Sequence, residues 1–122
     1  MSRDRRRAAY RHGHWAEAAA ALLLTLKGYR LLARRYRTPA GEIDLIVRRR
    51  RTVAFVEVKA RADYADAVEA VARGGERRIA AAADLWVARH PGAAGLTLRF
   101  DMVVVTPWRL PQHLPDAFRP GW

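Results

Sequence analysis

The chain has 122 residues, 51% of them hydrophobic, which is enough for one domain with its own core. It contains no cysteine, which excludes disulfides and thiolate metal sites and is typical of a cytoplasmic protein. Its 23 lysines and arginines against 12 acidic residues give a net charge of +11, which favours a polyanionic partner, nucleic acid before membrane.

The N-terminal part combines a basic segment with an apolar one. Residues 1–12 are rich in arginine and poor in apolar residues, so we expect a flexible basic arm. Residues 14–27 are strong helix formers that end at Gly28, which predicts a helix. No run is long enough to span a membrane. The predicted apolar stripe of the helix is Ala18, Leu22, Leu23 and Leu26.

Residues 29–61 predict three strands. Tyr29–Arg37 is typical of a strand with mixed faces, and Thr38–Gly41 of a turn. From Gly41 to Arg61 two apolar, β-branched runs flank four arginines, which predicts an antiparallel hairpin with residues 49–52 as its loop. In that register Arg48 faces Val53, Ile46 faces Phe55, and Asp44 faces Glu57.

The hairpin is also where charged residues enter an apolar context. Side chains alternate along a strand, so Glu57 and Lys59 share one face, with Val56 and Val58 on the other, and Asp44 shares a face with Glu42 and Ile46. Opposed side chains have Cβ atoms about 5 Å apart, and like charges there are destabilising unless a cation lies between them.

Two carboxylates suit Mg²⁺ or Mn²⁺, and the lysine beside them can stabilise charge developing on a phosphate or help to activate a water. Lys59 is one of only two lysines among the 23 basic residues. An ammonium that can shift its pKa is not equivalent to a guanidinium where chemistry is involved. The alternative is a polar sheet face with a surface Glu–Lys pair.

Two strings carry a family resemblance. Asp44, twelve intervening residues and Glu57-Val58-Lys59 resemble the PD-(D/E)XK signature of restriction-endonuclease-like nucleases. Gly-Glu-Ile-Asp-Leu-Ile followed by Phe-Val-Glu-Val-Lys-Ala-Arg resembles more narrowly the bacterial YraN family (UPF0102-type), an endonuclease-like group similar to Holliday junction resolvases. The resemblance implies that Asp44 and Glu57 hold Mg²⁺ with help from the Val58 carbonyl, and that Lys59 serves catalysis.

The resemblance extends to the first helix, where Gly13 and Glu17 match a Gly…Glu pair of the family. It implies that Glu17 is an additional acidic residue of the site. The other interpretation is a solvated first-turn glutamate favoured by the helix dipole, although its apolar neighbours predict less exposure than is usual for glutamate. Near Gly74–Glu76 the family usually has a helix start rich in lysine or glutamine that faces the site, and this chain departs from it there.

The remaining elements complete an α/β pattern. Helices are expected over 63–72 and from about 76 to 89, the second with Ile79, Ala83 and Trp86 as its apolar stripe. His90 is interpreted as a cap or surface residue rather than a ligand. Leu96–Val105 alternates as a strand, with Arg99 and Asp101 as an ion pair at the sheet edge. Residues 106–122 predict an irregular strap whose tryptophans cover apolar surface, with base stacking by Trp108 or Trp122 as the alternative.

We therefore expect a basic arm (1–12) and a single nuclease-like domain (13–122) of the restriction-endonuclease-like αβββαβ class, a mixed sheet flanked by helices. The expected function is a metal-dependent endonuclease acting on DNA, with branched DNA as one candidate substrate. The alternatives are a nucleic-acid-binding module of the same fold and a protein-interaction domain. Symmetric cleavage of a junction would require a homodimer. The candidate phosphate contacts are Arg34, Arg35, Arg37, Arg49, Arg50, Arg51 and Arg61.

Overall fold

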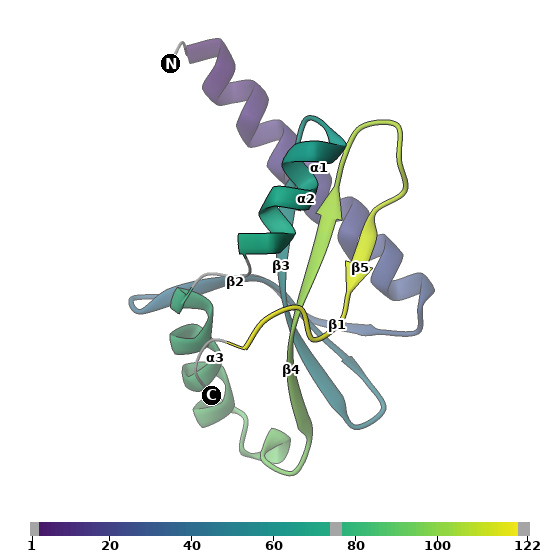
Figure 1. Ribbon diagram of the computed structural model, residues 1–122. Coiled ribbons are helices and arrows are strands. Elements are labelled where there is room, and N and C mark those ends of the chain that lie inside the picture. Colours follow the sequence, from purple (N-terminus) through teal and green to yellow (C-terminus); the bar gives the residue numbers. More distant parts are fainter. Residues whose placement is uncertain (1–2, 74–76, 120–122) are drawn as a thin grey trace.

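The structure, a computed structural model, describes residues 3–73 and 77–119, with side chains for residues 13–73 and 78–119. These residues form three helices, one short 3₁₀ helix and the strands of one mixed sheet (Figure 1). The elements are α1 (Arg3–Leu26), β1 (Arg30–Thr38), β2 (Gly41–Arg49), β3 (Thr52–Ala60), α2 (Tyr64–Arg73), α3 (Arg77–Arg89), η1 (Pro91–Ala93), β4 (Thr97–Val105) and β5 (Gln112–Leu114).

The five strands form one sheet in the order β1-β2-β3-β4-β5. The β3–β4 pair is parallel and the other pairs are antiparallel, which confirms the expected mixed sheet and the αβββαβ core. The parallel pair needs a crossover connection, and helices α2 and α3 supply it. Strand β5, in the segment expected to be an irregular strap, is an addition to the predicted core.

The helices cover opposite faces of the sheet. Neighbouring strand residues divide between two buried clusters: Val56 packs with α1, whereas Phe55 packs with α3. Because successive side chains point to opposite faces, α1 lies on one face and α3 on the other. Helix α2 packs against β4 on the α3 side, where its Ala67 contacts Met102.

Helix α1 differs from the prediction at its start and in its buried face. It begins at Arg3, so the backbone of residues 3–12, expected to form an arm, is helical. Its buried residues are Ala16, Ala20 and Leu24, each at most 1% exposed, whereas Leu22 is 60% exposed. The predicted stripe is therefore wrong, because a helix that is apolar on nearly two faces does not itself indicate which face meets the sheet.

The β2–β3 hairpin has the predicted register and a shorter turn. Ile46 pairs with Phe55 and Arg48 with Val53, as expected. The pairing continues to Arg49 and Thr52, so the loop is the two residues 50–51 rather than four. The register is unaffected because both loops are centred on the same point. Arg50 has a φ of 55°, the left-handed conformation that two-residue hairpin turns require.

The C-terminal half contains one confirmed stripe and two corrections. Ile79, Ala83 and Trp86 are buried as predicted, and His90 Nδ1 lies 2.7 Å from the Trp86 carbonyl oxygen, as expected of a cap. Asp101 does pair with Arg99, at 2.7 Å, but it is fully buried because β5 covers β4, so the pair is not at a sheet edge. Trp108 covers no apolar surface, since it is fully exposed, and Trp122 lies outside the described residues.

No helix of the described part is long and apolar enough to cross a membrane.

Candidate active site

The candidate site lies where the sheet pairing is interrupted at Asp44. Between β1 and β2 the paired residues run on both sides of Arg35 and Asp44 but omit these two. Between β2 and β3 the pairing ends at Leu45 and Val56, one residue before Asp44 would meet Glu57. Arg35 has a φ of 49°, a conformation that a non-glycine residue adopts rarely and at some cost, and such outliers cluster at functional sites.

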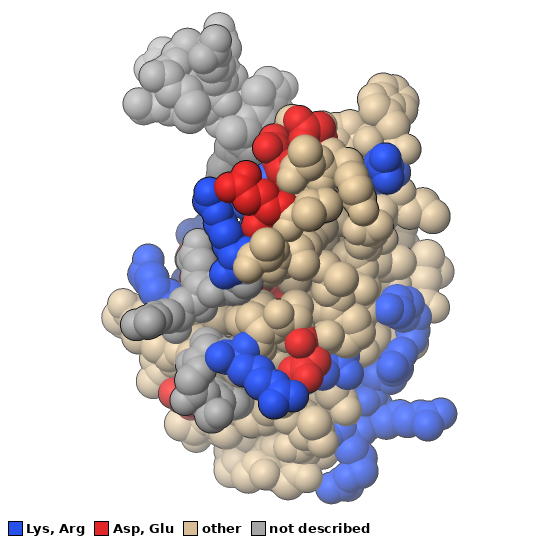
Figure 2. All heavy atoms as spheres, in the orientation of Figure 1, with Lys and Arg blue, Asp and Glu red and all other residues tan. Residues whose placement is uncertain are grey.

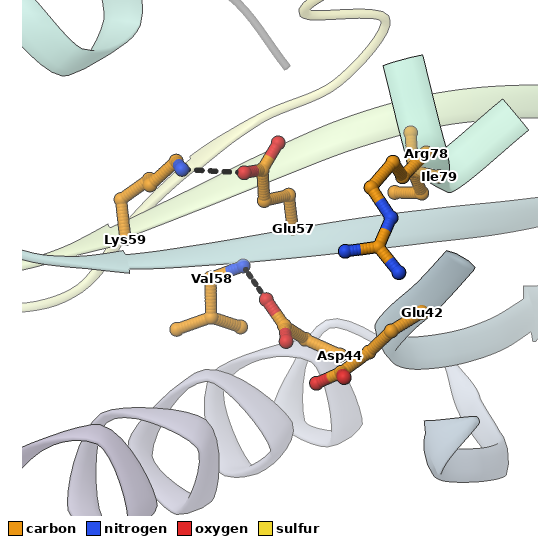
Figure 3. A pocket seen from close by; sticks show the side chains of 7 residues that line it. All are labelled: Glu42, Asp44, Glu57, Val58, Lys59, Arg78 and Ile79. Carbon is orange, nitrogen blue, oxygen red and sulfur yellow. Dashed lines mark hydrogen bonds and ion pairs between the residues drawn. The ribbon is translucent and has the colours of Figure 1, made fainter. Parts of the chain in front are cut away.

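The interruption changes the direction of the Asp44 side chain. Ile43 and Ile46 pack in the same buried cluster although strict alternation would place them on opposite faces, so the alternation is broken between them. Asp44 consequently turns toward α1, and its Oδ2 accepts a hydrogen bond of 2.7 Å from the backbone N–H of Val58 (Figure 3). The expectation that Asp44 shares a face with Ile46 is wrong for this reason.

Glu57 and Lys59 lie on the other side of β3, as the alternation predicts (Figure 3). Lys59 Nζ is 2.5 Å from Glu57 Oε1, and the two side chains are only 18% and 10% exposed. Val58, between them, points toward α1 and packs against its cluster. A half-buried ion pair of this kind is not the solvated Glu–Lys surface pair considered as the alternative.

Two cavities meet where the strand pairing is interrupted at Asp44. The first, of about 290 Å³, opens on the α3 side and is lined by Glu42, Asp44, Glu57, Val58, Lys59, Arg78 and Ile79. The second, of about 340 Å³, opens on the α1 side and is lined by Gly13, His14, Ala16, Glu17, Arg35, Arg37, Glu42, Asp44, Val58, Ala60 and Arg61. Asp44, Glu42 and Val58 border both cavities, so two carboxylates are accessible from both sides of β3.

Burial raises the pKa of Asp44 from 3.8 to about 6, since the carboxylate loses hydration that its surroundings do not replace. The hydrogen bond from Val58 lowers this pKa, and repulsion from Glu17, Glu57 and Glu42 raises it further. The expected repulsion between Asp44 and Glu57 is therefore present, but desolvation is the larger effect. A cation bound to the Asp44 carboxylate would lower its pKa and so offset both the desolvation and the repulsion.

Glu17 belongs to the second cavity. It lies well inside α1 rather than in the first turn, and its side chain is 13% exposed, which confirms the low exposure expected from its neighbours. Arg35 Nε donates to Glu17 Oε2 at 2.6 Å. Arg35, whose backbone is left-handed, therefore holds its side chain against Glu17 in this cavity. Gly13, four residues before Glu17, lines the same cavity.

The candidate phosphate contacts divide into two groups. Arg35, Arg37 and Arg61 line the second cavity, beside the carboxylates. The loop arginines lie at the far end of the hairpin, about 17 Å from Asp44 for five residues of strand. There Arg49 and Arg50 line a separate cavity with Lys27, and Arg51 donates to the Gly95 carbonyl. Arg34 belongs to neither group: it is exposed on β1 and pairs with Leu45, next to Asp44. Basic side chains gather on one side of the lower part of the molecule (Figure 2).

Three polar residues that line the cavities were not among the candidate site residues from the sequence: Glu42, Arg78 and His14. Glu42 could have been found from the sequence, because it stands in the Gly-Glu-Ile-Asp string two residues before Asp44. His14 follows Gly13 at the start of the predicted helix. Arg78 comes from α3, and only the tertiary packing brings it to the hairpin. The departure at Gly74–Glu76 lies outside the described residues.

The donor set is of the right chemistry for a hard divalent cation but is sparse. Asp44, Glu57 and the Val58 carbonyl offer oxygen ligands, and Mg²⁺ typically takes one or two carboxylates and keeps several waters. Over residues 13–73 and 78–119, no group of three or more acidic, histidine or cysteine side chains is close enough to hold a metal. The residues fit a cation that is held partly by water and substrate.

The fold and site define a class: an α/β domain with a mixed sheet, in which two carboxylates and a lysine converge where two strands separate. Residues 16–105 match the family described as uncharacterised protein family UPF0102, and the chain belongs to this family. The resemblance to the YraN family is thereby confirmed.

Three curated relatives that match nearly the whole chain are each described as a UPF0102 protein. One, from Mesorhizobium japonicum, is 57% identical over 113 residues, which cover 93% of this chain and 90% of the relative. Another, from Rhizobium meliloti, is 58% identical and covers 90% of each chain. A third, from Agrobacterium fabrum, is 57% identical and covers 94% of each chain.

Proposed function

We propose that this protein is a metal-dependent endonuclease that hydrolyses DNA phosphodiesters, with Asp44, Glu57 and the Val58 carbonyl as ligands of Mg²⁺ or Mn²⁺ and Lys59 beside them. The observation that carries the proposal is the convergence of these residues on one open cavity, with a partly buried carboxylate whose pKa is raised to about 6. A divalent cation bound there would polarise the phosphate and lower the pKa of a coordinated water.

The chain's own groups would supply the rest of the chemistry. The Lys59 ammonium, held at 2.5 Å by Glu57, can donate to a non-bridging phosphate oxygen as negative charge develops there, or orient the attacking water. Hydrolysis forms a bond from the water oxygen to phosphorus and breaks the bond to the leaving oxygen, which takes up a proton. Glu17 lies in the adjoining cavity and is proposed as an outer acidic residue. Arg35, Arg37 and Arg61 are proposed to hold flanking phosphates.

The test is cleavage of a panel of labelled DNAs: duplex, single-stranded, flap and four-way junction, each with Mg²⁺, Mn²⁺ or EDTA. We expect cleavage with metal only. Asp44→Asn and Glu57→Gln should each abolish cleavage and leave DNA affinity unchanged or slightly higher, since removing negative charge from a phosphate-binding cavity does not weaken binding. Full activity in either variant would exclude this site as the nuclease centre.

The second candidate is a nucleic-acid-binding module of the same fold without efficient catalysis. The specific observation in its favour is that the Glu57 carboxylate already forms an ion pair with Lys59. In addition, no third acidic or histidine side chain joins Asp44 and Glu57 as a metal ligand among residues 13–73 and 78–119. The net charge of +11 supports both candidates equally. Tight binding of the DNA panel with no cleavage under any metal would favour the module. The absence of any DNA binding would exclude both.

A further inference from the structure

Arg78 points into the first cavity from the start of α3. Its guanidinium lies between Glu57 on one side and Glu42 and Asp44 on the other (Figure 3). The ion pairs found among residues 13–73 and 78–119 do not include Arg78. A cation that lines an acidic cavity without a direct partner has its hydrogen-bond donors available for a ligand.

The main chain of Arg78 is held in place by close packing. A Cβ atom on Gly41 would lie 1.9 Å from the Arg78 carbonyl oxygen, so only glycine allows α3 to approach the start of β2 this closely. The next residue, Ile79, is 3% exposed and belongs to the core. The same contact that fixes the helix therefore fixes the point from which the Arg78 side chain reaches the cavity.

The position is unfavourable for arginine on helix grounds alone. The first turn of a helix carries partial positive charge, which favours acidic over basic residues there. The first turn of α3 contains no acidic residue and places Arg78 there instead. A local preference that is broken in this way is expected where function requires it. The planar guanidinium offers two parallel N–H groups, a geometry that matches a phosphate.

We propose that Arg78 is the phosphate anchor of the cavity: its guanidinium donates to the non-bridging oxygens of a nucleic-acid phosphodiester, opposite Lys59. The inference rests on the proposed function for the class of ligand, a nucleic-acid phosphate. Three carboxylates (Glu42, Asp44 and Glu57) line the cavity against two cations, so an incoming phosphate meets net negative charge unless these cations face it. Arg78 and Lys59 come from α3 and β3 and lie on different sides of the space that a phosphate would fill (Figure 3).

The test compares Arg78→Gln with Arg89→Gln, which makes the same charge change at the other end of the same helix. DNA affinity is measured by fluorescence anisotropy of a labelled duplex in EDTA, over a series of salt concentrations. For Arg78→Gln we expect weaker binding and a log K against log salt slope that is smaller by about one, the value for one lost phosphate contact. Arg89→Gln should keep the wild-type slope. Thermal stability of Arg78→Gln should equal or exceed that of the wild type.

The outcomes separate the anchor from the proposed function. If the wild type cuts no DNA with any metal while Arg78→Gln alone loses slope, the nuclease proposal fails and the anchor stands. An unchanged affinity and slope in Arg78→Gln overturns the anchor, whether or not the wild type cleaves. Equal losses in Arg78→Gln and Arg89→Gln also overturn it, because they would reflect only general charge. A lower melting temperature for Arg78→Gln with wild-type binding would assign the arginine to neutralising the carboxylates and overturn the anchor.

Discussion

Replacing Asp44 by asparagine should stabilise the metal-free protein at neutral and alkaline pH. The carboxylate loses much of its hydration on folding, and Glu17, Glu57 and Glu42 add repulsion. Asparagine is the same shape and removes the charge. Its side-chain oxygen can still accept the hydrogen bond that Val58 donates to Asp44 Oδ2 at 2.7 Å. The variant therefore relieves the unfavourable charge without leaving a buried donor unpaired.

The size and pH dependence of the effect follow from the raised pKa of Asp44. A shift from 3.8 to about 6 corresponds to about 3 kcal/mol of destabilisation when the carboxylate is ionised in both states, so we expect a gain of roughly 1–3 kcal/mol for asparagine. Because the folded protein holds this proton more tightly, the wild type is penalised fully only above pH 6. The penalty declines as the pH falls toward 3.8 and is absent below it. The advantage of Asp44→Asn should follow the same course.

The measurement is urea unfolding of both proteins in EDTA at pH 8, 6 and 4.5. The matched control is Glu42→Gln, which removes a charge from the same two cavities at a side chain that is 51% exposed and carries little desolvation cost. The control should change the free energy of unfolding by less than about 0.5 kcal/mol. Equal stability of the wild type and Asp44→Asn at pH 8, or an advantage that does not vary with pH, would refute the reasoning.

Four further predictions test other parts of the structure. Lys59→Arg should reduce cleavage at least about 100-fold despite keeping the charge, because the guanidinium cannot deprotonate and is wider; wild-type rates would instead indicate a simple phosphate contact. Millimolar Mg²⁺ or Mn²⁺ should raise the wild-type melting temperature by mass action and raise that of Asp44→Asn much less; equal shifts would mean that Asp44 is no ligand. Changing arginines 49–51 to glutamine should flatten the salt dependence of DNA affinity, and an unchanged slope would show that this end of the hairpin does not face DNA. Gly41→Ala should destabilise the fold by about 1–3 kcal/mol in denaturant unfolding, since its Cβ would meet a backbone oxygen at 1.9 Å, whereas Gly95→Ala, with no atom within 4 Å, should be nearly neutral.

Much of the hairpin could be predicted from the sequence because its determinants are local. Apolar alternation and a turn centred on residues 50–51 are sufficient to pair Ile46 with Phe55 and to place Glu57 and Lys59 on one face. The predicted stripe of α3 was also correct, because Ile79, Ala83 and Trp86 recur at helical spacing on the side of the helix away from the exposed Asp84. The sequence thus determined which strands pair and which side chains carry the candidate chemistry.

The tertiary structure decided how those side chains are aimed. The interruption at Asp44 depends on β1, β2 and β3 together, so alternation within β2 could not reveal that this carboxylate turns toward α1 and binds the Val58 N–H. The buried face of α1 was chosen by the sheet, since leucines were available on both sides of the helix. Asp101 is buried because β5 covers it, and β5 itself is a three-residue strand whose stability comes from its neighbour. Arg78 reaches the cavity because Gly41 permits a close approach between segments far apart in the chain. Local patterns encode periodicity and pairing, whereas burial and side-chain direction depend on contacts between distant segments that no local pattern contains.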